Sequence, residues 1–91
     1  MRTFSRASQF KKDVKRAGKR GEDLSKLRFL MDLLIEGKPL PQEFKDHPLR
    51  GNFSGSRDCH INPDWVLIYT FTQMGSHVCF ERTGTHSDLF R

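Results

Sequence analysis

The sequence predicts a small α+β protein in which an antiparallel sheet is covered on one face by a helical layer. Apolar residues at helical spacing occupy the N-terminal half of the chain. Runs of β-branched and aromatic residues, separated by turn signals, occupy the C-terminal half. The 91 residues have the length of one domain, and we expect residues 1–91 to form it.

A basic amphipathic helix is predicted after a possible short N-terminal strand over residues 1–4. Its buried stripe consists of apolar residues at helical spacing, namely Phe10, Val14 and Ala17. Ser5 or Ser8 could cap its N-terminus by accepting a hydrogen bond from a free backbone N–H. Lysine and arginine side chains occupy the other faces of this helix.

A second amphipathic helix is predicted, and its apolar residues recur at three- and four-residue steps: Leu24, Leu27, Leu30, Met31 and Leu34. Glu22 and Asp23 place negative charge in its first turn, where the helix dipole favours it. Gly37, followed by two prolines, ends the helix. The short connection between the two predicted helices favours an antiparallel helical hairpin.

Three strands are predicted in the second half, arranged as a meander. Residues 53–61 alternate in polarity, residues 65–71 are almost wholly apolar, and residues 78–82 form the third strand. The apolar run is typical of a central strand that is covered on both faces. The segment between the second helix and the first strand, residues 38–51, contains three prolines and is predicted to be a stiff loop that presents His47.

The two cysteines, Cys59 and Cys79, are predicted to be free thiols. In a meander they flank the central strand on opposite sides, about 9–10 Å apart. A disulfide requires Cα atoms within about 7 Å. We therefore expect reduced thiols, as in the cytoplasm.

The charge balance favours a polyanionic partner. Sixteen Lys and Arg residues against eleven Asp and Glu give a formal net charge of +5, which attracts nucleic acid or other anions.

No stretch approaches the roughly 18 apolar residues of a membrane span. The N-terminal residues lack the apolar region of a secretory signal. The expected setting is the cytoplasm, without a membrane partner.

Three of the four histidines lie in polar segments of the second half. Histidine can give or take a proton near neutral pH. His60 shares one face of its predicted strand with Asp58. In the predicted meander, Asp64 and His86 fall at the same edge of the sheet as His60, and His47 approaches from the loop. The fourth histidine, His77, is expected to be a solvated surface residue.

This set of residues indicates acid–base cleavage of a phosphodiester. Internal attack needs a base for the 2′-hydroxyl, an acid for the leaving oxygen and a cation for the phosphorane. His47, His60, Asp64 and His86 are candidates for proton transfer; Lys45, Arg57 and Arg82 are candidates for phosphate binding; Phe90 and Trp65 are candidates for base stacking. Trp65 is also a candidate core residue, and Phe90 could instead pack the tail onto the sheet.

No metal or cofactor is expected from the sequence. Neither a His-x₃-His nor a Cys-x₂-Cys pair is present, and the many cations nearby would repel a divalent ion.

Several segments in the same order carry a family resemblance. They are Phe44-Lys45-Asp46-His47-Pro48-Leu49, Arg57-Asp58-x-His60, Pro63-Asp64-Trp65 and Glu81-Arg82-Thr83-Gly84-Thr85-His86 with the following Leu89-Phe90. Together they resemble the YafQ-like mRNA interferases of the RelE toxin superfamily, from about residue 10 to the C-terminus. The sequence departs from the family mainly at the extreme N-terminus and near residues 74–77.

The resemblance implies a RelE-like fold, an antiparallel sheet with the helical hairpin on one face. It implies ribosome-dependent mRNA cleavage in the ribosomal A site, with the ribosome and mRNA as partners. It also implies inhibition by a cognate DinJ-like antitoxin and contact with operator DNA through the antitoxin complex. The catalytic residues that it implies are His47, His60, Asp64, His86 and Phe90, with Arg82 next to the phosphate.

Two other functions remain open at this point. A ParE-like protein would share the fold but inhibit DNA gyrase by binding alone. A small basic nucleic-acid-binding module would bind in a salt-dependent manner without cleavage. Within the leading hypothesis, His86 is the expected general acid and His47 or His60 the base, while Asp64 either orients its partner or shares a proton with it.

Overall fold

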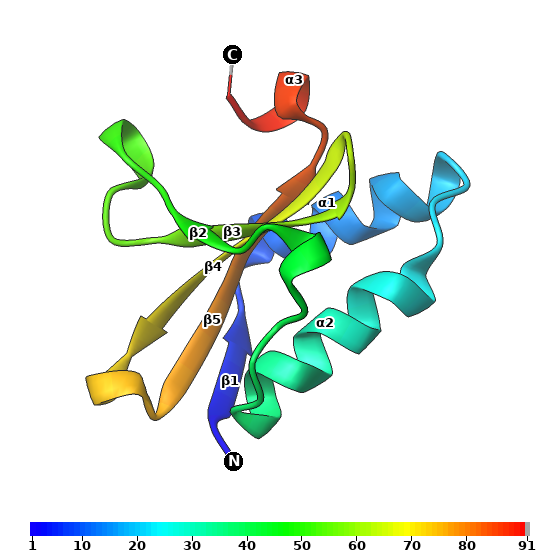
Figure 1. The fold of residues 1–91 in the computed structure, drawn as a ribbon. Coiled ribbons are helices and arrows are strands. Elements are labelled where there is room, and N and C mark those ends of the chain that lie inside the picture. The colour runs from blue at the N-terminus through cyan, green and yellow to red at the C-terminus, as the bar shows by residue number, and fades with distance from the viewer. Residues whose placement is uncertain (91) are drawn as a thin grey trace.

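The chain forms a five-stranded sheet with two helices against one face (Figure 1). The computed structural model describes residues 1–90. The strands are β1 (Thr3–Arg6), β2 (His47–Pro48), β3 (Arg57–Asn62), β4 (Trp65–Thr72) and β5 (His77–Gly84), in the order β1-β5-β4-β3-β2. The helices are α1 (Ser8–Lys19), α2 (Leu24–Glu36) and the short α3 (His86–Leu89), with three 3₁₀ turns, η1 (Gln42–Phe44), η2 (Gly51–Phe53) and η3 (Gln73–Gly75).

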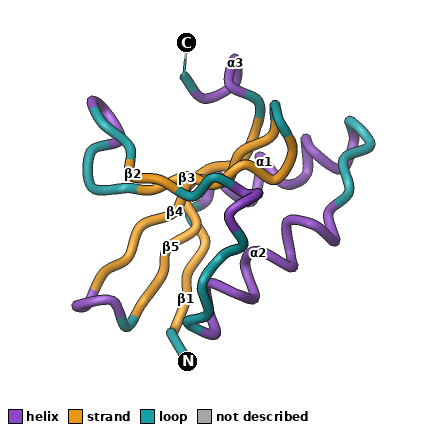
Figure 2. Tube along the Cα trace, in the orientation of Figure 1, coloured by secondary structure: helices purple, strands orange, loops and turns teal. Residues whose placement is uncertain are grey.

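The predicted α+β architecture is confirmed, with one addition. Strands β3, β4 and β5 form the antiparallel meander. Strand β1 joins the outer edge of β5 in parallel orientation, so the sheet is mixed. Figure 2 shows α1 and α2 together on one side of the strands. The predicted strand over residues 1–4 is displaced by two residues, to Thr3–Arg6.

The central strand β4 is buried on both faces, as its apolar run predicts. Its residues Trp65, Leu67 and Tyr69 pack against the helices together with Phe10, Leu27 and Leu30, whereas Val66 and Ile68 pack on the opposite face with Leu89. Burial of each large apolar side chain contributes about 1.5–3 kcal/mol. Two small cores therefore hold β4, and the candidate site is built over the second one.

Helix α1 differs from its prediction at the N-terminus and in its buried face. The predicted serine caps are wrong, since Ala7 occupies the cap position and no side chain accepts a hydrogen bond there. Phe10 and Ala17 are buried as expected. Asp13 is buried as well, because it lies on the same face of the helix.

Helix α2 ends where its sequence signals predict, whereas Glu22 and Asp23 precede its first turn instead of lying in it. The Asp23 side chain caps the helix by accepting a hydrogen bond from the Ser25 backbone N–H at 3.0 Å. Gly37 closes the helix with a φ of 77°, a conformation that suits glycine. Leu24 is 38% exposed, so the buried stripe is made by the later leucines.

Two segments that were predicted as loop or tail have regular structure. His47 lies on the two-residue strand β2, which is too short to leave a periodic pattern, and the first predicted strand begins only at Arg57. Residues His86–Leu89 form α3, held by a capping box between Thr85 and Asp88. Both additions place a histidine on a defined element.

The cysteines lie as predicted, whereas His77 does not. Cys59 and Cys79 are free and lie on strands that flank β4 on opposite sides. His77 is not merely solvated, since its Nδ1 lies 2.7 Å from the Thr3 hydroxyl and its Nε2 lies 2.9 Å from the Ser5 hydroxyl. It therefore ties β1 to β5. Among residues 1–90, the helices are all too short or too polar to cross a membrane.

Candidate active site

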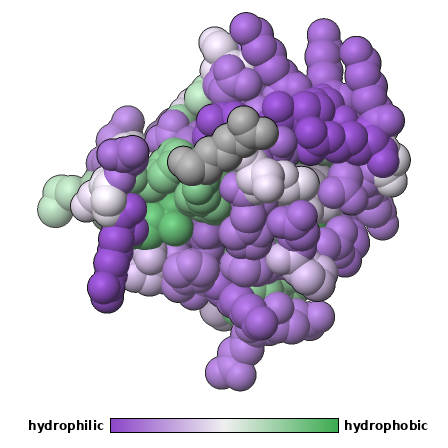
Figure 3. Space-filling view, turned by 90° about the horizontal axis from the view of Figure 1, so that it is seen from above, coloured by the Kyte–Doolittle hydropathy of each residue, from purple (hydrophilic) through white to green (hydrophobic). Residues whose placement is uncertain are grey.

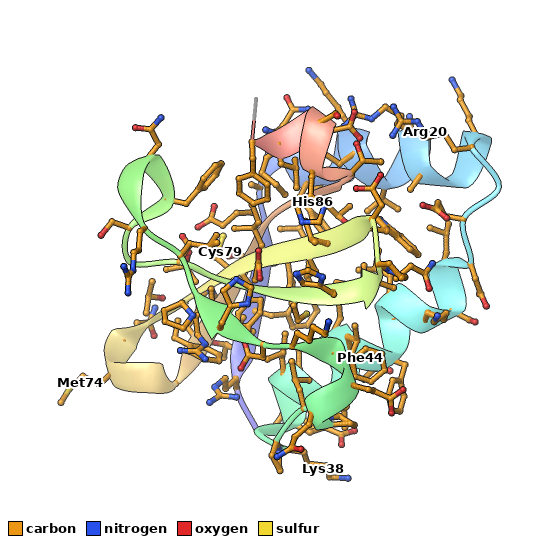
Figure 4. The ribbon with its side chains drawn as sticks, turned by 45° about the horizontal axis from the view of Figure 1, so that its top comes forward. Arg20, Lys38, Phe44, Met74, Cys79 and His86 are labelled. Atoms are coloured by element: carbon orange, nitrogen blue, oxygen red, sulfur yellow. The ribbon has the colours of Figure 1, made fainter. Side chains whose placement is uncertain are left out.

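Three imidazoles form a row on the face of the sheet opposite to α1 and α2. His60 of β3 pairs with Val66, which places its side chain on the face of the second core. The ring centroids are 5.9 Å apart for His47 and His60, and 5.4 Å apart for His60 and His86. Residues from β2, β3 and α3 thus meet at one place, as the sequence predicted. Figure 4 shows His86 over the sheet at this position.

The local reason for this convergence is the pairing of short elements. The pair His47–Asp58 is one of two that join β2 to β3, so the His47 ring lies beside the Asp58 side chain. The Thr85 capping box starts α3 directly after β5, which places His86 at its first turn.

Seen from above, the surface around α3 is mostly hydrophilic with a small hydrophobic patch (Figure 3).

Asp64 holds His86 by two contacts. Its Oδ1 accepts a hydrogen bond from the His86 backbone N–H at 3.1 Å and lies 2.9 Å from the ring Nδ1. Since an ionised carboxylate can only accept, Nδ1 carries the proton and Nε2 remains for the substrate. These hydrogen bonds lower the pKa of Asp64. The carboxylate therefore stays charged throughout the pH range in which imidazoles titrate.

Both ring nitrogens of His47 lie close to oxygen atoms. Its Nδ1 lies 2.7 Å from the Lys45 carbonyl oxygen, and its Nε2 lies 3.1 Å from Asp58 Oδ1. Asp58 is almost fully buried beneath the imidazoles. Burial raises the pKa of its carboxyl group, and the positive charges of His47, His60 and His86 oppose that rise. Sequence reasoning placed Asp58 on the face of His60 but did not include it in the site.

Asp58 Oδ1 is buried without a well-directed hydrogen bond from any residue of the described chain. The His47 Nε2 lies 3.1 Å away but makes no hydrogen bond to it. A buried acceptor in this state favours a proton or a cation nearby. The alternation of residues along β3, which places Asp58 on the face of His60, was the sequence signal that could have identified Asp58 as a site residue.

His60 is the least constrained of the three imidazoles. Its ring makes no hydrogen bond with any residue within 1–90. Burial lowers the pKa of His60, while the nearby Asp58 carboxylate acts in the opposite direction. The neutral form, which can accept a proton, is favoured as a result.

Phe90 and Trp65, the two stacking candidates, have different fates. The Phe90 ring is 37% exposed and its centroid lies 5.8 Å from that of His86 and 5.6 Å from that of Phe53. Trp65 is only 1% exposed and packs in the core beneath the helices. The exposed Phe90 ring can stack on a base. The prediction that Trp65 stacks on a base is wrong, because its ring is buried.

The two candidate arginines already have carboxylate partners. Arg82 Nε lies 2.7 Å from the buried Asp13 Oδ2, and Arg57 lies 3.2 Å from Asp46. Lys45 is exposed beside His60. Phosphate binding by these three cations stays a prediction. Within residues 1–90, Lys45 makes no ion pair, so it could bind a phosphate without first losing a carboxylate partner.

His47, Asp58 and His60 could also hold a divalent ion. One ligand atom from each lies within 4.8 Å of the others. The expectation of no metal site rested on the lack of local spacing, whereas the structure assembles the three groups from two strands. Imidazole and carboxylate suit zinc and copper.

Comparison with known proteins supports a family assignment. Residues 2–91 match the family model described as the bacterial toxin of type II toxin–antitoxin system, YafQ. The chain is 51% identical over 90 residues to the mRNA interferase toxin YafQ of Escherichia coli strain K12, covering 98% of this chain and 96% of that protein.

Two solved structures have the same fold. A chain of the E. coli DinJ–YafQ complex superposes with a TM-score of 0.91 at 50% identity, covering 100% of both chains. A metal-bound toxin from Helicobacter pylori gives a TM-score of 0.90 at 37% identity, covering 99% of this chain and 100% of that one. The predicted RelE-like fold and family are confirmed. The chain belongs to the YafQ family of bacterial toxins from type II toxin–antitoxin systems.

Proposed function

We propose that this toxin is a ribosome-dependent endoribonuclease that cleaves mRNA in the ribosomal A site without a metal ion. One observation carries the proposal. The proton-bearing Nδ1 of His86 lies 2.9 Å from Asp64 Oδ1, and the centroid of the His86 ring lies 5.4 Å from that of the His60 ring. A base and an acid are therefore adjacent, as internal phosphodiester cleavage requires. The name of the E. coli relative, an mRNA interferase, supports the same activity.

The reaction follows from these roles. His60 takes the proton from the 2′-hydroxyl, and the resulting oxygen attacks the adjacent phosphorus. His86 gives a proton to the departing 5′-oxygen, which leaves a 2′,3′-cyclic phosphate and a free 5′-hydroxyl. Lys45 stabilises the negative oxygens of the phosphorane. We assign His47 to the support of Asp58 beneath the site rather than to the substrate proton, because its Nδ1 faces the Lys45 carbonyl oxygen and its Nε2 lies 3.1 Å from Asp58 Oδ1.

The other two functions are less well supported. A gyrase inhibitor or a simple nucleic-acid-binding module has no chemical need for adjacent imidazoles and carboxylates. The YafQ family match also favours the ribonuclease. As partners we propose a DinJ-like antitoxin, which the E. coli complex supports, together with ribosomes and mRNA in the cytoplasm and operator DNA through the antitoxin complex.

The direct test is to map mRNA 5′ ends after a short pulse of expression. Wild type should produce cuts within translated codons, and a His60→Ala/His86→Ala double variant should produce none. DNA damage without mRNA cuts would favour gyrase inhibition instead.

Asp64 should support the His86 ring over the whole pH range of the reaction. The hydrogen bonds from His86 lower the pKa of Asp64, so its carboxylate stays ionised and keeps holding the Nδ1 side of the ring in acidic solution. Asp64→Ala removes this support, and the misplaced ring should slow single-turnover cleavage by about 10²-fold at every pH between about 5.5 and 9. A rate equal to that of wild type would exclude this positioning role for Asp64.

Chelation should leave the cleavage rate unchanged, whereas added zinc should lower it. EDTA-treated toxin should keep its full rate, since the acid and base are side chains. Zn²⁺ should inhibit by occupying His47, Asp58 and His60, whose ligand atoms converge within 4.8 Å. His47→Gln should raise the inhibitory zinc concentration by at least about tenfold, each rate being compared with that of the same EDTA-treated variant without added zinc. A loss of activity on chelation would contradict metal independence.

A further inference from the structure

A pocket of about 480 Å³ opens next to the catalytic row. It lies at the end of β3, where β2 has already stopped pairing, and η1 and the first turns of α2 form its other walls. Its lining includes Lys26, Glu43, Phe44, Lys45, His60 and Asn62. We call it the Phe44 pocket. Figure 4 shows Phe44 on η1, beside α2.

The Phe44 pocket combines an aromatic ring with two cations. Phe44 is partly exposed, and its ring centroid lies 6.3 Å from that of Phe29, which is 51% exposed. Lys26 and Lys45 supply positive charge at the rim. Stacking surfaces beside a cationic path are the features by which proteins bind single-stranded nucleic acid.

Polar groups in the pocket can read a base edge. The Lys26 ammonium donates a hydrogen bond to Asn62 Oδ1, which fixes the amide and leaves its N–H groups for a ligand. The Glu43 carboxylate is exposed and can accept from an exocyclic amino group. The volume lies within the range of about 300–1,000 Å³ that is usual for small-molecule sites.

We propose that the Phe44 pocket binds the unpaired base of a nucleotide next to the scissile phosphate and sets the sequence preference of cleavage. The proposal rests on the proposed function, because His60 belongs to both the catalytic row and the pocket lining. This shared residue places the pocket within one nucleotide of the reacting 2′-hydroxyl. The base stacks on Phe44, its edge faces Asn62 and Glu43, and Lys26 and Lys45 attract the adjoining phosphates.

The test couples a pocket variant to a substrate that lacks the base. Phe44→Leu keeps an apolar side chain against the core but removes the stacking face. On ribosomes programmed with all-ribose mRNA, it should lower kcat/KM by about 5- to 150-fold. An abasic ribose at one of the nucleotides flanking the cut should lower the wild-type value similarly, and Phe44→Leu should then cause no further loss. Asn62→Ala should reduce the discrimination between bases at that same position.

Controls separate this proposal from its alternatives. Phe4→Leu alters a ring that is 50% exposed on β1, away from the pocket lining, and should leave cleavage unchanged. Independent losses from Phe44→Leu and from the abasic nucleotide at every flanking position would overturn the proposal. It would also be overturned if Phe44→Leu and Asn62→Ala weakened antitoxin binding but not cleavage. If His86→Ala cut as fast as wild type, the proposed function itself would fail, whatever the pocket variants did.

Discussion

Replacing His86 by alanine should reduce mRNA cleavage by about 10²–10⁴-fold, the contribution that a positioned acid or base makes. Without the imidazole, the departing 5′-oxygen must leave as an alkoxide or wait for a proton from water. Asp64, which faces Nδ1 at 2.9 Å, cannot reach the same point because it lies on the far side of that ring. Substrate binding should change little, so the loss should appear in the single-turnover rate at saturating ribosomes.

A second histidine provides the matched control for this measurement. His77 bridges β1 and β5 through two hydroxyl contacts and lies outside the catalytic row. His77→Ala should therefore retain the wild-type cleavage rate, even if thermal unfolding shows a lower stability. Equal losses in His77→Ala and His86→Ala would point to a general folding defect and remove the argument for His86 as the acid.

The fold could be predicted to the extent that burial imposes a period on the sequence. The leucines of α2 and the apolar run of β4 are regular because each faces a core, and both elements appeared where expected. The two-residue strand β2 and the four-residue helix α3 each span only about one period, so their pattern is never repeated. No hydrophobic pattern can therefore mark them, although Thr85 and Asp88 do form the local capping signal for α3.

The meander predicted that His47, His60 and His86 would meet, although they lie far apart in the chain. The distances between their rings could not be predicted, because they depend on strand register, which composition does not reveal. Asp58 was missed for a related reason. An aspartate on a strand usually faces solvent, and only the structure shows this carboxylate beneath three imidazoles.

For Arg82, the position in the sequence fits two roles, phosphate binding and an ion pair within the fold. It adjoins the α3 segment and was predicted to bind phosphate. In the structure its guanidinium contacts Asp13, a residue that helical spacing alone did not distinguish from the exposed polar positions of α1. The ion pair joins α1 to the edge of β5, just beyond the last residue that β1 covers.

Replacing Asp13 by alanine should lower the free energy of unfolding by about 1.5–3 kcal/mol, as expected when a buried carboxylate that accepts charge-assisted hydrogen bonds is removed. The Asp13 side chain is 0% exposed and accepts hydrogen bonds from Arg82 Nε at 2.7 Å and from the Thr83 backbone N–H at 3.1 Å. Alanine would leave the buried N–H without a partner, and the guanidinium without its counter-charge. Urea denaturation should show a lower midpoint at an unchanged slope.

Asp32→Ala is the matched control, since this aspartate is exposed on α2. Surface substitutions of this kind change stability by less than about 0.5 kcal/mol. Asp13→Asn separates the two parts of the effect, because the amide oxygen still accepts the Thr83 N–H while the charge is lost. We expect it to fall between the alanine variant and wild type. Similar midpoints for Asp13→Ala and Asp32→Ala would show that α1 is held on β5 by apolar contacts alone, and that the Asp13–Arg82 pair adds nothing to the fold.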